Sequence, residues 1–525
     1  MLPAELVQRV ALFLPDSASF FAFLDAFSSD DAHLPRDLES FAALGQSITS
    51  RPFLWPCLHL HAPPQDAAML AHLAVALCHV RSDKIVIHGA FDLTWLVQLL
   101  QTTTTNHCRL HLETTDRVPS ITHLSTLPIV SWRVLYSPYT QPIPHAFYGM
   151  PALVELDVCV DSWSAFDLDA FFRWLSTDAS RVTSLALVWS LSGARTDARM
   201  ESMRRRTAIE ISPTMLADLT TYIATHPVQH LSLSALDFEY EDGTDARLPA
   251  FYDALAASST LESVSILDCH NVELDVHMFA TPLPWTTLAI DSTSCMHVDD
   301  KRGLVPALRQ SPAVRVLSID VVREWNWAFD VFENQMMELV ADALPHTQVD
   351  DLTLIVRDVG ATKLESTWMT LRHSRVKALR LDLHTEGGTL ELIRQLAMHL
   401  PAMATLERLT VRAVGWVMDN DDLVSALAHA LWRSRLIVVD LANNGMPDRI
   451  MPALLAGLPE NNTVRKLVLD GNALTNVGAT NVIEAIRART QPLDSLSLGN
   501  NDRLRRRPLE KLAKRQPRII RSILF

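Results

Sequence analysis

One pattern of nine residues, LxxLxLxxN with Leu or Val at the L positions, occurs three times near the C-terminal end of the chain. The copies cover residues 436–444, 464–472 and 493–501, so their first residues lie 28 and 29 residues apart. A unit of that length holds one strand and one helix, and it cannot bury its apolar side chains alone. Repeated units therefore stack on their neighbours, and the pattern predicts an elongated solenoid that offers a surface to a partner.

Apolar starts of the same kind continue upstream, mostly 24–35 residues apart. They lie at Leu406, Val376, Val349, Val314, Trp285, Leu261, Val228, Val182 and Leu153. The 46 residues between Val182 and Val228 predict an inserted polar loop. Weaker strand-like runs begin at Lys84, Arg109 and Trp132 and indicate degenerate repeats.

The segments between these strands have helical periodicity. Leu423, Leu427 and Leu431 share one helical face, as do Val482, Ile483 and Ile486. A strand and a full helix in each repeat are typical of the long, ribonuclease-inhibitor-like form of the leucine-rich repeat. The expected fold is an α/β solenoid, a horseshoe with a parallel inner sheet and outer helices, preceded by a short N-terminal helical segment.

The last position of the nine-residue pattern predicts a structural role. An asparagine there can bond backbone groups of the turn that leaves the strand, where no sheet partner exists. Asn444, Asn472 and Asn501 occupy this position, and Cys269 occupies it in an earlier repeat.

Four regions are expected: a helical segment or cap at 1–45, a linker with degenerate repeats at 46–150, leucine-rich repeats at 151–501, and a basic cap or tail at 502–525. The tail holds nine Lys or Arg against two Asp or Glu, a charge of +7, whereas the whole chain has −14. We expect the tail to form a capping helix; binding to anionic lipid or a nuclear signal is the alternative.

Charge, cysteines and hydropathy limit the function classes. The body of the chain is acidic and would repel phosphates, so nucleic acid is not expected as the main partner. The six cysteines are scattered without a CxxC pair, which favours an intracellular, reducing compartment, either cytoplasm or nucleus. No apolar run reaches the length of a membrane span, and the N-terminus lacks the pattern of a signal peptide.

Catalytic and cofactor motifs are missing from the sequence. It contains no phosphate-binding GxxxxGK[ST], no GxGxxG after a strand, no HExxH and no GxSxG. His107 and His111 have the spacing of metal ligands on a helix, but their surroundings favour a strand, which would hold them about 13 Å apart. His59 and His61 are likewise expected on a strand or loop surface. We therefore expect no enzyme, no metal and no cofactor.

The first residues carry two apolar stripes. One runs through Leu6, Val10, Phe13 and Leu14, and Pro15–Ser17 separates it from a second stripe at 20–27. Two short amphipathic helices cannot bury both stripes alone, so they need the repeats or another protein.

This segment resembles the F-box. The family motif is matched in order by Leu2, Pro3, Glu5, Leu6, Val10 and Leu14, although its later Val-x-x-Trp part is represented only by Phe53–Trp55. The resemblance implies that Leu2, Pro3, Leu6, Val10 and Leu14 contact a Skp1-like adaptor, and that the repeats hold a substrate of a Skp1–cullin–F-box ubiquitin ligase. The alternative is that residues 1–30 are only the end cap that a solenoid requires.

The inner sheet surface is the expected substrate site, because residues that flank the buried leucines of a strand point away from the core. This rule places Arg380 and Asp382 on one strand, Arg408 and Arg412 on the next, and Asp440 on the third, with Asp320 and Asp291 further along. Such arginines can bind an acidic or phosphorylated segment. Salt bridges within the sheet are the other interpretation.

The sequence thus predicts a non-enzymatic binding adaptor, with ubiquitin-ligase substrate recruitment as the leading hypothesis. The second hypothesis is a stand-alone scaffold or inhibitor that uses the same surface without Skp1.

Overall fold

A computed structural model describes residues 4–524 except 15–16, 28–33, 48–53, 56, 80–83, 89–92, 103–108, 115–126, 137–146, 161–166, 190–208, 239–246, 270–271, 273, 275–281, 292–303, 322–340, 342, 357–364, 384–388, 414–419, 502, 506–507 and 510–519. The chain forms two compact units, Met1–Thr260 (unit 1) and Leu261–Phe525 (unit 2). Each unit alternates parallel strands with helices.

Unit 1 begins with three helices and continues with a row of parallel strands in the order β1-β2-β3-β4-β5-β6-β8. A separate short pair joins β7 to β9. The elements are α1 (Ala4–Phe13), α2 (Ser17–Phe27), α3 (Arg36–Ser47), β1 (Leu58–Leu60), α4 (Ala67–His79), β2 (Lys84–His88), α5 (Thr94–Thr102), β3 (Arg109–Thr114), β4 (Ile129–Tyr136), β5 (Glu155–Val160), α6 (Leu168–Leu175), β6 (Ser184–Trp189), β7 (Ile209–Glu210), α8 (Pro213–Thr225), β8 (His230–Ser234), β9 (Leu236–Asp237) and α9 (Arg247–Ala257).

Unit 2 pairs each strand with the next in sequence, from β10 to β19, all parallel. Its elements are β10 (Ser263–Leu267), β11 (Thr287–Asp291), α11 (Leu304–Gln310), β12 (Val316–Val321), β13 (Asp351–Val356), α13 (Glu365–Leu371), β14 (Ala378–Leu383), α14 (Thr389–His399), β15 (Arg408–Ala413), α15 (Asp421–Arg433), β16 (Val438–Asp440), α16 (Met451–Leu455), β17 (Lys466–Val468), α17 (Asn476–Arg487), β18 (Leu493–Ser497) and β19 (Ile520–Leu524). Short 3₁₀ turns join several of them.

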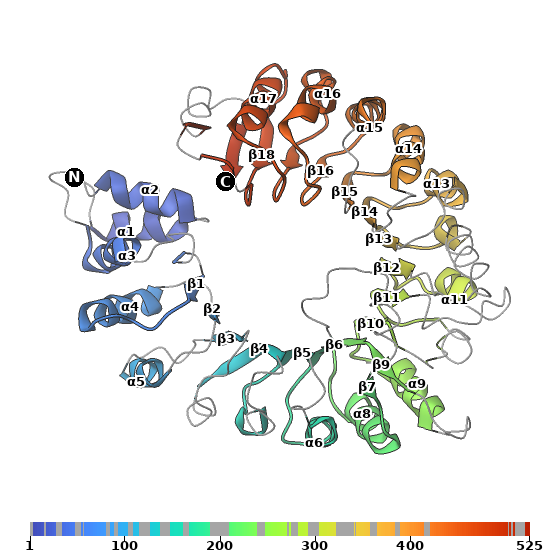
Figure 1. Ribbon diagram of the computed structural model, residues 1–525. Helices are drawn as coiled ribbons and strands as arrows, with labels where there is room; N and C mark the ends of the chain where they lie inside the picture. Colours follow the sequence, from blue (N-terminus) through green and yellow to red (C-terminus); the bar gives the residue numbers. More distant parts are fainter. Residues whose placement is uncertain are drawn as a thin grey trace. The chain divides into compact units, whose positions relative to one another are not determined.

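The helices of each unit lie on one side of its strands, as expected. Figure 1 shows α4, α5, α6 and α8 along one side of the strand row of unit 1, and α13 to α17 along one side of that of unit 2. This order of parallel strands with crossover helices is the leucine-rich-repeat solenoid that the sequence predicted.

The predicted repeat starts are confirmed with a constant offset. From Leu153 to Val464, each apolar start is buried and the strand begins two residues later. The weaker runs at Lys84, Arg109 and Trp132 also lie on strands, namely β2, β3 and β4. Full burial of such an aliphatic side chain stabilises the fold by about 1.5–3 kcal/mol.

The predicted asparagines form a buried ladder in unit 2. Asn472 Oδ1 accepts hydrogen bonds from the backbone amides of Asn444 (3.1 Å) and Met446 (3.0 Å) in the preceding repeat. Its Nδ2 donates to the carbonyl oxygens of Leu441 (3.0 Å) and Leu469 (2.9 Å). Asn444 and Asn501 make equivalent bonds to carbonyl oxygens of their own and the preceding repeat. The ladder therefore fixes each turn to its neighbour.

The residue before this position has a left-handed backbone, a feature that the sequence pattern did not reveal. Gly471 has φ +62°, and Asn443, Asn500 and Asp268 have φ of 57°, 54° and 55°. Asp268 precedes Cys269, which is buried and donates from Sγ to the carbonyl oxygen of Leu267 (3.5 Å). The conformation turns the chain sharply at the end of the strand, so Cys269 occupies the same kind of turn as the asparagines.

The three N-terminal helices pack around one aromatic cluster. The Trp55 ring stacks on Phe20 at 4.5 Å and meets Phe41 edge-on at 5.9 Å, and all three side chains are buried. Trp55 Nε1 also donates to the carbonyl oxygen of Leu14 (2.8 Å). At Gly45 a Cβ atom would lie 2.6 Å from the Phe21 ring, so only glycine lets α3 approach α2 this closely.

The described part of the C-terminal tail has a helical start and a strand at its end: Pro508 and buried Leu509 are helical. Its described end, β19, is a strand that pairs in parallel with β18, with Ser495 opposite Ser522. Residues 510–519, on which most of the expected capping helix falls, lie outside the described part of the chain.

We expect Asn472→Ala to lower the free energy of unfolding by about 3 kcal/mol, because several buried backbone groups would lose their partners together. Asn462→Ala is the matched control: Asn462 is exposed and accepts one hydrogen bond from Thr490. Its expected effect is below about 0.5 kcal/mol. Urea denaturation of both variants provides the measurement. Equal losses in the free energy of unfolding would contradict a stabilising role for the asparagine ladder.

Candidate functional site

The register of unit 2 brings the predicted site residues together. Asp382 lies opposite Arg412, and Thr410 lies opposite both Arg380 and Asp440. Neighbouring strands are about 4.8 Å apart, so the predicted residues of β14, β15 and β16 occupy one face about 10 Å wide across the strands, and Arg408 and Arg412 lie about 13 Å apart along β15. This surface, formed by Arg380, Asp382, Arg408, Arg412 and Asp440, is called the charged strand face.

Arg380 is already paired within the sheet. Its Nη2 and Nε donate to the same carboxylate oxygen of Asp382, at 2.6 and 3.0 Å. This hydrogen bond is the main reason that the pKa of the Arg380 guanidinium is raised, with smaller effects from the charges of Asp382 and Asp440. Asp382 is buried, whereas the Arg380 side chain is 42% exposed. For these two residues, the salt-bridge interpretation is confirmed.

Arg408 and Arg412 retain more bonding capacity than Arg380. Arg408 is exposed and Arg412 is half-buried, and Nε of Arg412 has no hydrogen-bond partner among the described residues. Burial raises the pKa of the Asp351 carboxyl two strands away, and the charge of Arg408 opposes that rise. Arg408 therefore stands on the face as a donor that an acidic group can approach, whereas the unpartnered Nε of Arg412 is a buried atom.

Asp291 and Asp320 do not contribute an exposed acidic extension of this face. They are register partners on β11 and β12, and both are buried. Asp291 accepts a hydrogen bond from the backbone amide of Asp268, the left-handed residue at the end of β10. Its carboxylate therefore holds a turn, a role that the sequence did not indicate.

Helix α1 presents the second predicted surface. Leu6, Val10 and Phe13 are 44%, 42% and 73% exposed, whereas Val7 and Ala11 on the other side of the helix are buried. The spacing of Leu6, Val10 and Phe13 places them on one helical face at successive turns. Leu14 is half-buried, and Leu2 and Pro3 lie outside the described residues. We call Leu6, Val10 and Phe13 the α1 stripe.

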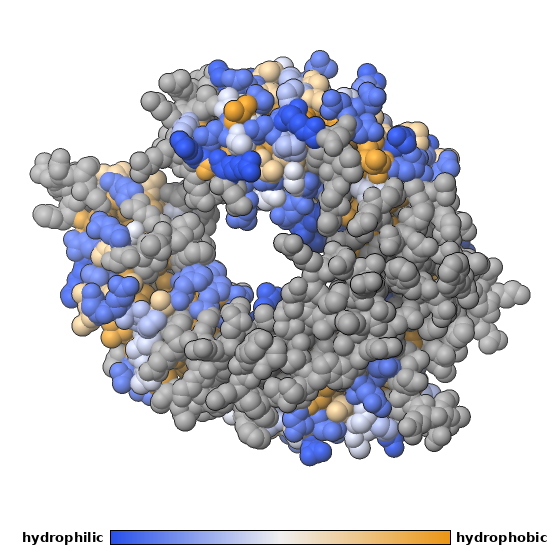
Figure 2. All heavy atoms as spheres, in the orientation of Figure 1, coloured by the Kyte–Doolittle hydropathy of each residue, from blue (hydrophilic) through white to orange (hydrophobic). Residues whose placement is uncertain are grey.

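The α1 stripe differs from the exposed apolar residues of unit 2. There, Met369, Met398 and Val477 lie on three different helices, and Ile437 lies just before β16. Figure 2 shows hydrophobic residues scattered among hydrophilic ones over the helices of unit 2. Scattered apolar side chains are normal on a protein surface, but neighbouring ones on one helix form a patch suited to a partner.

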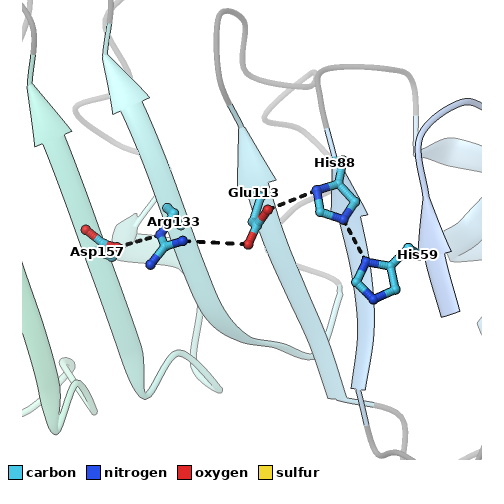
Figure 3. A network of polar contacts seen from close by, with 5 residues as sticks. All are labelled: His59, His88, Glu113, Arg133 and Asp157. Atoms are coloured by element: carbon cyan, nitrogen blue, oxygen red, sulfur yellow. Dashed lines mark hydrogen bonds and ion pairs between the residues drawn. The ribbon is translucent and has the colours of Figure 1, made fainter. Parts of the chain in front are cut away.

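A polar network on unit 1 was not predicted from the sequence. It crosses β2 to β5, where His88, Glu113, Arg133 and Asp157 are successive register partners, and it reaches His59 on β1 (Figure 3). Arg133 Nε donates to Asp157 Oδ2 at 2.6 Å, and this hydrogen bond is the main reason that the pKa of Arg133 is raised.

An irregularity in β4 explains why the network was missed. Leu110 lies opposite Ile129 but His111 lies opposite Ser131, so Val130 is an extra residue in β4. The extra residue places Trp132 in the core and Arg133 beside Glu113. A strict alternation from Ile129 would have put these two side chains on the opposite faces.

Other classes of site find no support in the described residues. No group of three or more His, Cys, Asp or Glu among them is placed to hold a metal ion. His107 lies outside them, and His111 is on β3, as expected. Within the same residues, no helix combines the length and the apolar character needed to cross a bilayer.

Comparison with solved structures gives distant likenesses. No protein-family model and no curated protein matches the chain. A solved protein from Bacteroides fragilis is 10% identical over 41% of this chain and 66% of its own length, with a TM-score of 0.29. TLR13, in a complex with ssRNA13, is 13% identical over 78% of this chain and 52% of its own length, with a TM-score of 0.30. The fold assignment therefore rests on the strand order and the asparagine ladder.

We expect Arg380→Ala to destabilise the protein by about 1 kcal/mol, because buried Asp382 loses its cation while the exposed arginine itself contributes little. Arg408→Ala is expected to change the free energy of unfolding by less than about 0.5 kcal/mol. Thermal or urea unfolding distinguishes the two. Equal losses would mean that Arg380 has no special structural role.

Proposed function

We propose that this chain is a non-enzymatic binding adaptor that holds two protein partners, one on the α1 stripe and one on the charged strand face. The observation that carries the proposal is the α1 stripe: three large apolar side chains stay exposed on a helix whose opposite side is packed. An exposed apolar stripe along one helical face is the form that a helix takes when it docks in the groove of another protein.

The specific function that we propose is substrate recognition in a Skp1–cullin–F-box ubiquitin ligase. Residues 1–45 would form the F-box-like segment, with Leu2, Pro3, Leu6, Val10 and Leu14 toward a Skp1-like adaptor. The exposure of Leu6 and Val10 supports this assignment, as does Trp55, whose ring completes the helical segment at the place where the F-box resemblance has its last aromatic residue. Leu14 would contribute less, because it is half-buried and its carbonyl oxygen is bonded to Trp55.

The repeats at 151–501 would hold the substrate, with the charged strand face as the contact site. Arg408 and Arg412 are the residues that we assign to an acidic or phosphorylated segment, because Arg380 is engaged by Asp382. Asp440 would contact a basic residue of the same segment. We place this activity inside the cell, in the cytoplasm or nucleus.

A stand-alone scaffold or inhibitor is the second candidate function. In that case α1 to α3 would serve only as the end cap of the solenoid. The hydrogen bond between His72 on α4 and Ser40 on α3 (3.2 Å) favours this candidate, since it joins the helical segment to the helix of the first repeat.

We expect Leu6→Asp with Val10→Asp to abolish co-purification with Skp1, since two carboxylates would have to be buried against the partner. Val477→Asp is the matched control, because Val477 is also exposed and apolar but lies on α17. Retention of Skp1 by the double variant, or no capture by the wild type, would leave the scaffold as the better proposal.

We expect Arg408→Glu with Arg412→Glu to reduce binding of peptides selected by the wild-type chain from a library of phosphorylated and acidic sequences by at least about tenfold. Arg433→Glu is the control, an exposed arginine on the last turn of α15. Unchanged peptide affinity in the double variant would remove the charged strand face from the proposal.

A further inference from the structure

The outward side chains of β1 to β5 in unit 1 carry four imidazoles. His59 and His61 lie at the β1 strand, His88 on β2, and His111 on β3, each offset from the buried residues of its strand. Histidine has an unperturbed pKa of about 6.5, so its charge changes near neutral pH. We call the close group of His59, His61 and His88 the histidine cluster.

The rings of the histidine cluster touch one another. His59 Nδ1 and His88 Nε2 are 2.8 Å apart and share one hydrogen bond. The ring of His61 stacks on His88 with centroids 4.3 Å apart and an angle of 3° between the planes. Glu113 holds the other nitrogen of His88, at 2.9 Å from Nδ1, and Arg133 holds Glu113 in turn (Figure 3).

This hydrogen-bond pattern sets how many protons the cluster accepts without rearrangement. With Nδ1–H of His88 donating to Glu113, Nε2 of His88 accepts from His59 Nδ1–H, and both rings are neutral. One added proton converts His88 to a cation and shifts His59 to its other tautomer, so the 2.8 Å bond persists. A second proton puts hydrogens on both facing nitrogens, and the rings must then separate.

The charged groups around the cluster determine the sign of the surface. The described side chains on this face of β1 to β5 include Arg109, Arg133, Glu113, Glu155 and Asp157. Protonation of all four imidazoles adds four positive charges to these two arginines and three carboxylates, so the face becomes more cationic as the pH falls. A further titratable group close in sequence to the cluster is the free thiol of Cys57, two residues before His59.

The neighbours of His61 oppose its protonation in the absence of a partner. Burial is the largest cause of its lowered pKa, the charge of His88 adds to it, and Glu113 acts in the other direction. An anion bound over the face would relieve the repulsion between the imidazolium groups. Binding and proton uptake are therefore coupled and must strengthen each other.

We propose that the histidine cluster makes the strand face of unit 1 a docking surface for an acidic protein segment. The surface binds that segment more tightly as the pH falls below neutrality. Charge complementarity identifies the partner: the face gains positive charge when its imidazoles are protonated, and Arg133 stays cationic throughout. This surface is separate from the α1 stripe and from the charged strand face, so the proposal does not depend on Skp1 or on the substrate assigned above.

The test uses the full chain and a fluorescent peptide of ten glutamates, with affinity measured by polarisation at pH 5.5 and 7.5. We expect binding about tenfold tighter at pH 5.5, with proton uptake seen as a dependence of the binding heat on the buffer. His59→Asn with His88→Asn should remove this pH dependence, and His61→Asn, a change at an exposed residue, should reduce it without affecting folding. Far-UV circular dichroism at both pH values checks that each protein stays folded.

Two controls separate this surface from others. His373→Asn changes an exposed histidine of unit 2 and should keep the pH dependence. Arg408→Glu with Arg412→Glu should also keep it. Equal affinity at the two pH values, an unchanged response in both the double His variant and His61→Asn, or binding of a single-stranded oligonucleotide in place of the peptide would each overturn the proposal.

Discussion

Each repeat of this protein satisfies its strand amides and carbonyls through the next repeat rather than within itself. Parallel pairing makes this unavoidable, since a parallel strand needs a crossover before it meets its partner. The buried asparagines extend the same dependence to the turns: Asn472 bonds the backbone of two consecutive repeats. Stability is therefore shared along the stack, and an isolated repeat would leave buried polar groups without partners.

The same constraint explains why the architecture was readable from the sequence. Apolar residues such as Val376 and Leu406 have to recur where each strand begins, and the helix between them has to show a separate period, as Leu423, Leu427 and Leu431 do. The left-handed residue before each asparagine was not readable, because Gly, Asn and Asp all occupy it. The closing strand β19 was not predicted, because the basic run that contains it is also compatible with a helix.

The candidate surfaces were predictable only in part. Alternation along β14 to β16 placed Arg380, Asp382, Arg408, Arg412 and Asp440 on one face, and the register agrees. Alternation does not reveal which of these side chains pair, and the Arg380–Asp382 bond depends on rotamers that the sequence does not encode locally. The network on unit 1 depends on one extra residue in β4, which reverses the faces of everything after it.

The small β7–β9 pair shows how this architecture absorbs extra chain. Strand β6 pairs directly with β8 in unbroken register, although 46 residues separate the buried starts of these two repeats and the others are mostly 24–35 apart. Two of the extra residues between β6 and β8 form β7. This strand pairs with β9, which follows β8, in a separate small sheet outside the main row of strands. The number of residues between two strands therefore does not set the distance between them in the sheet. A connection of this kind can lengthen over evolutionary time while the strands keep their spacing.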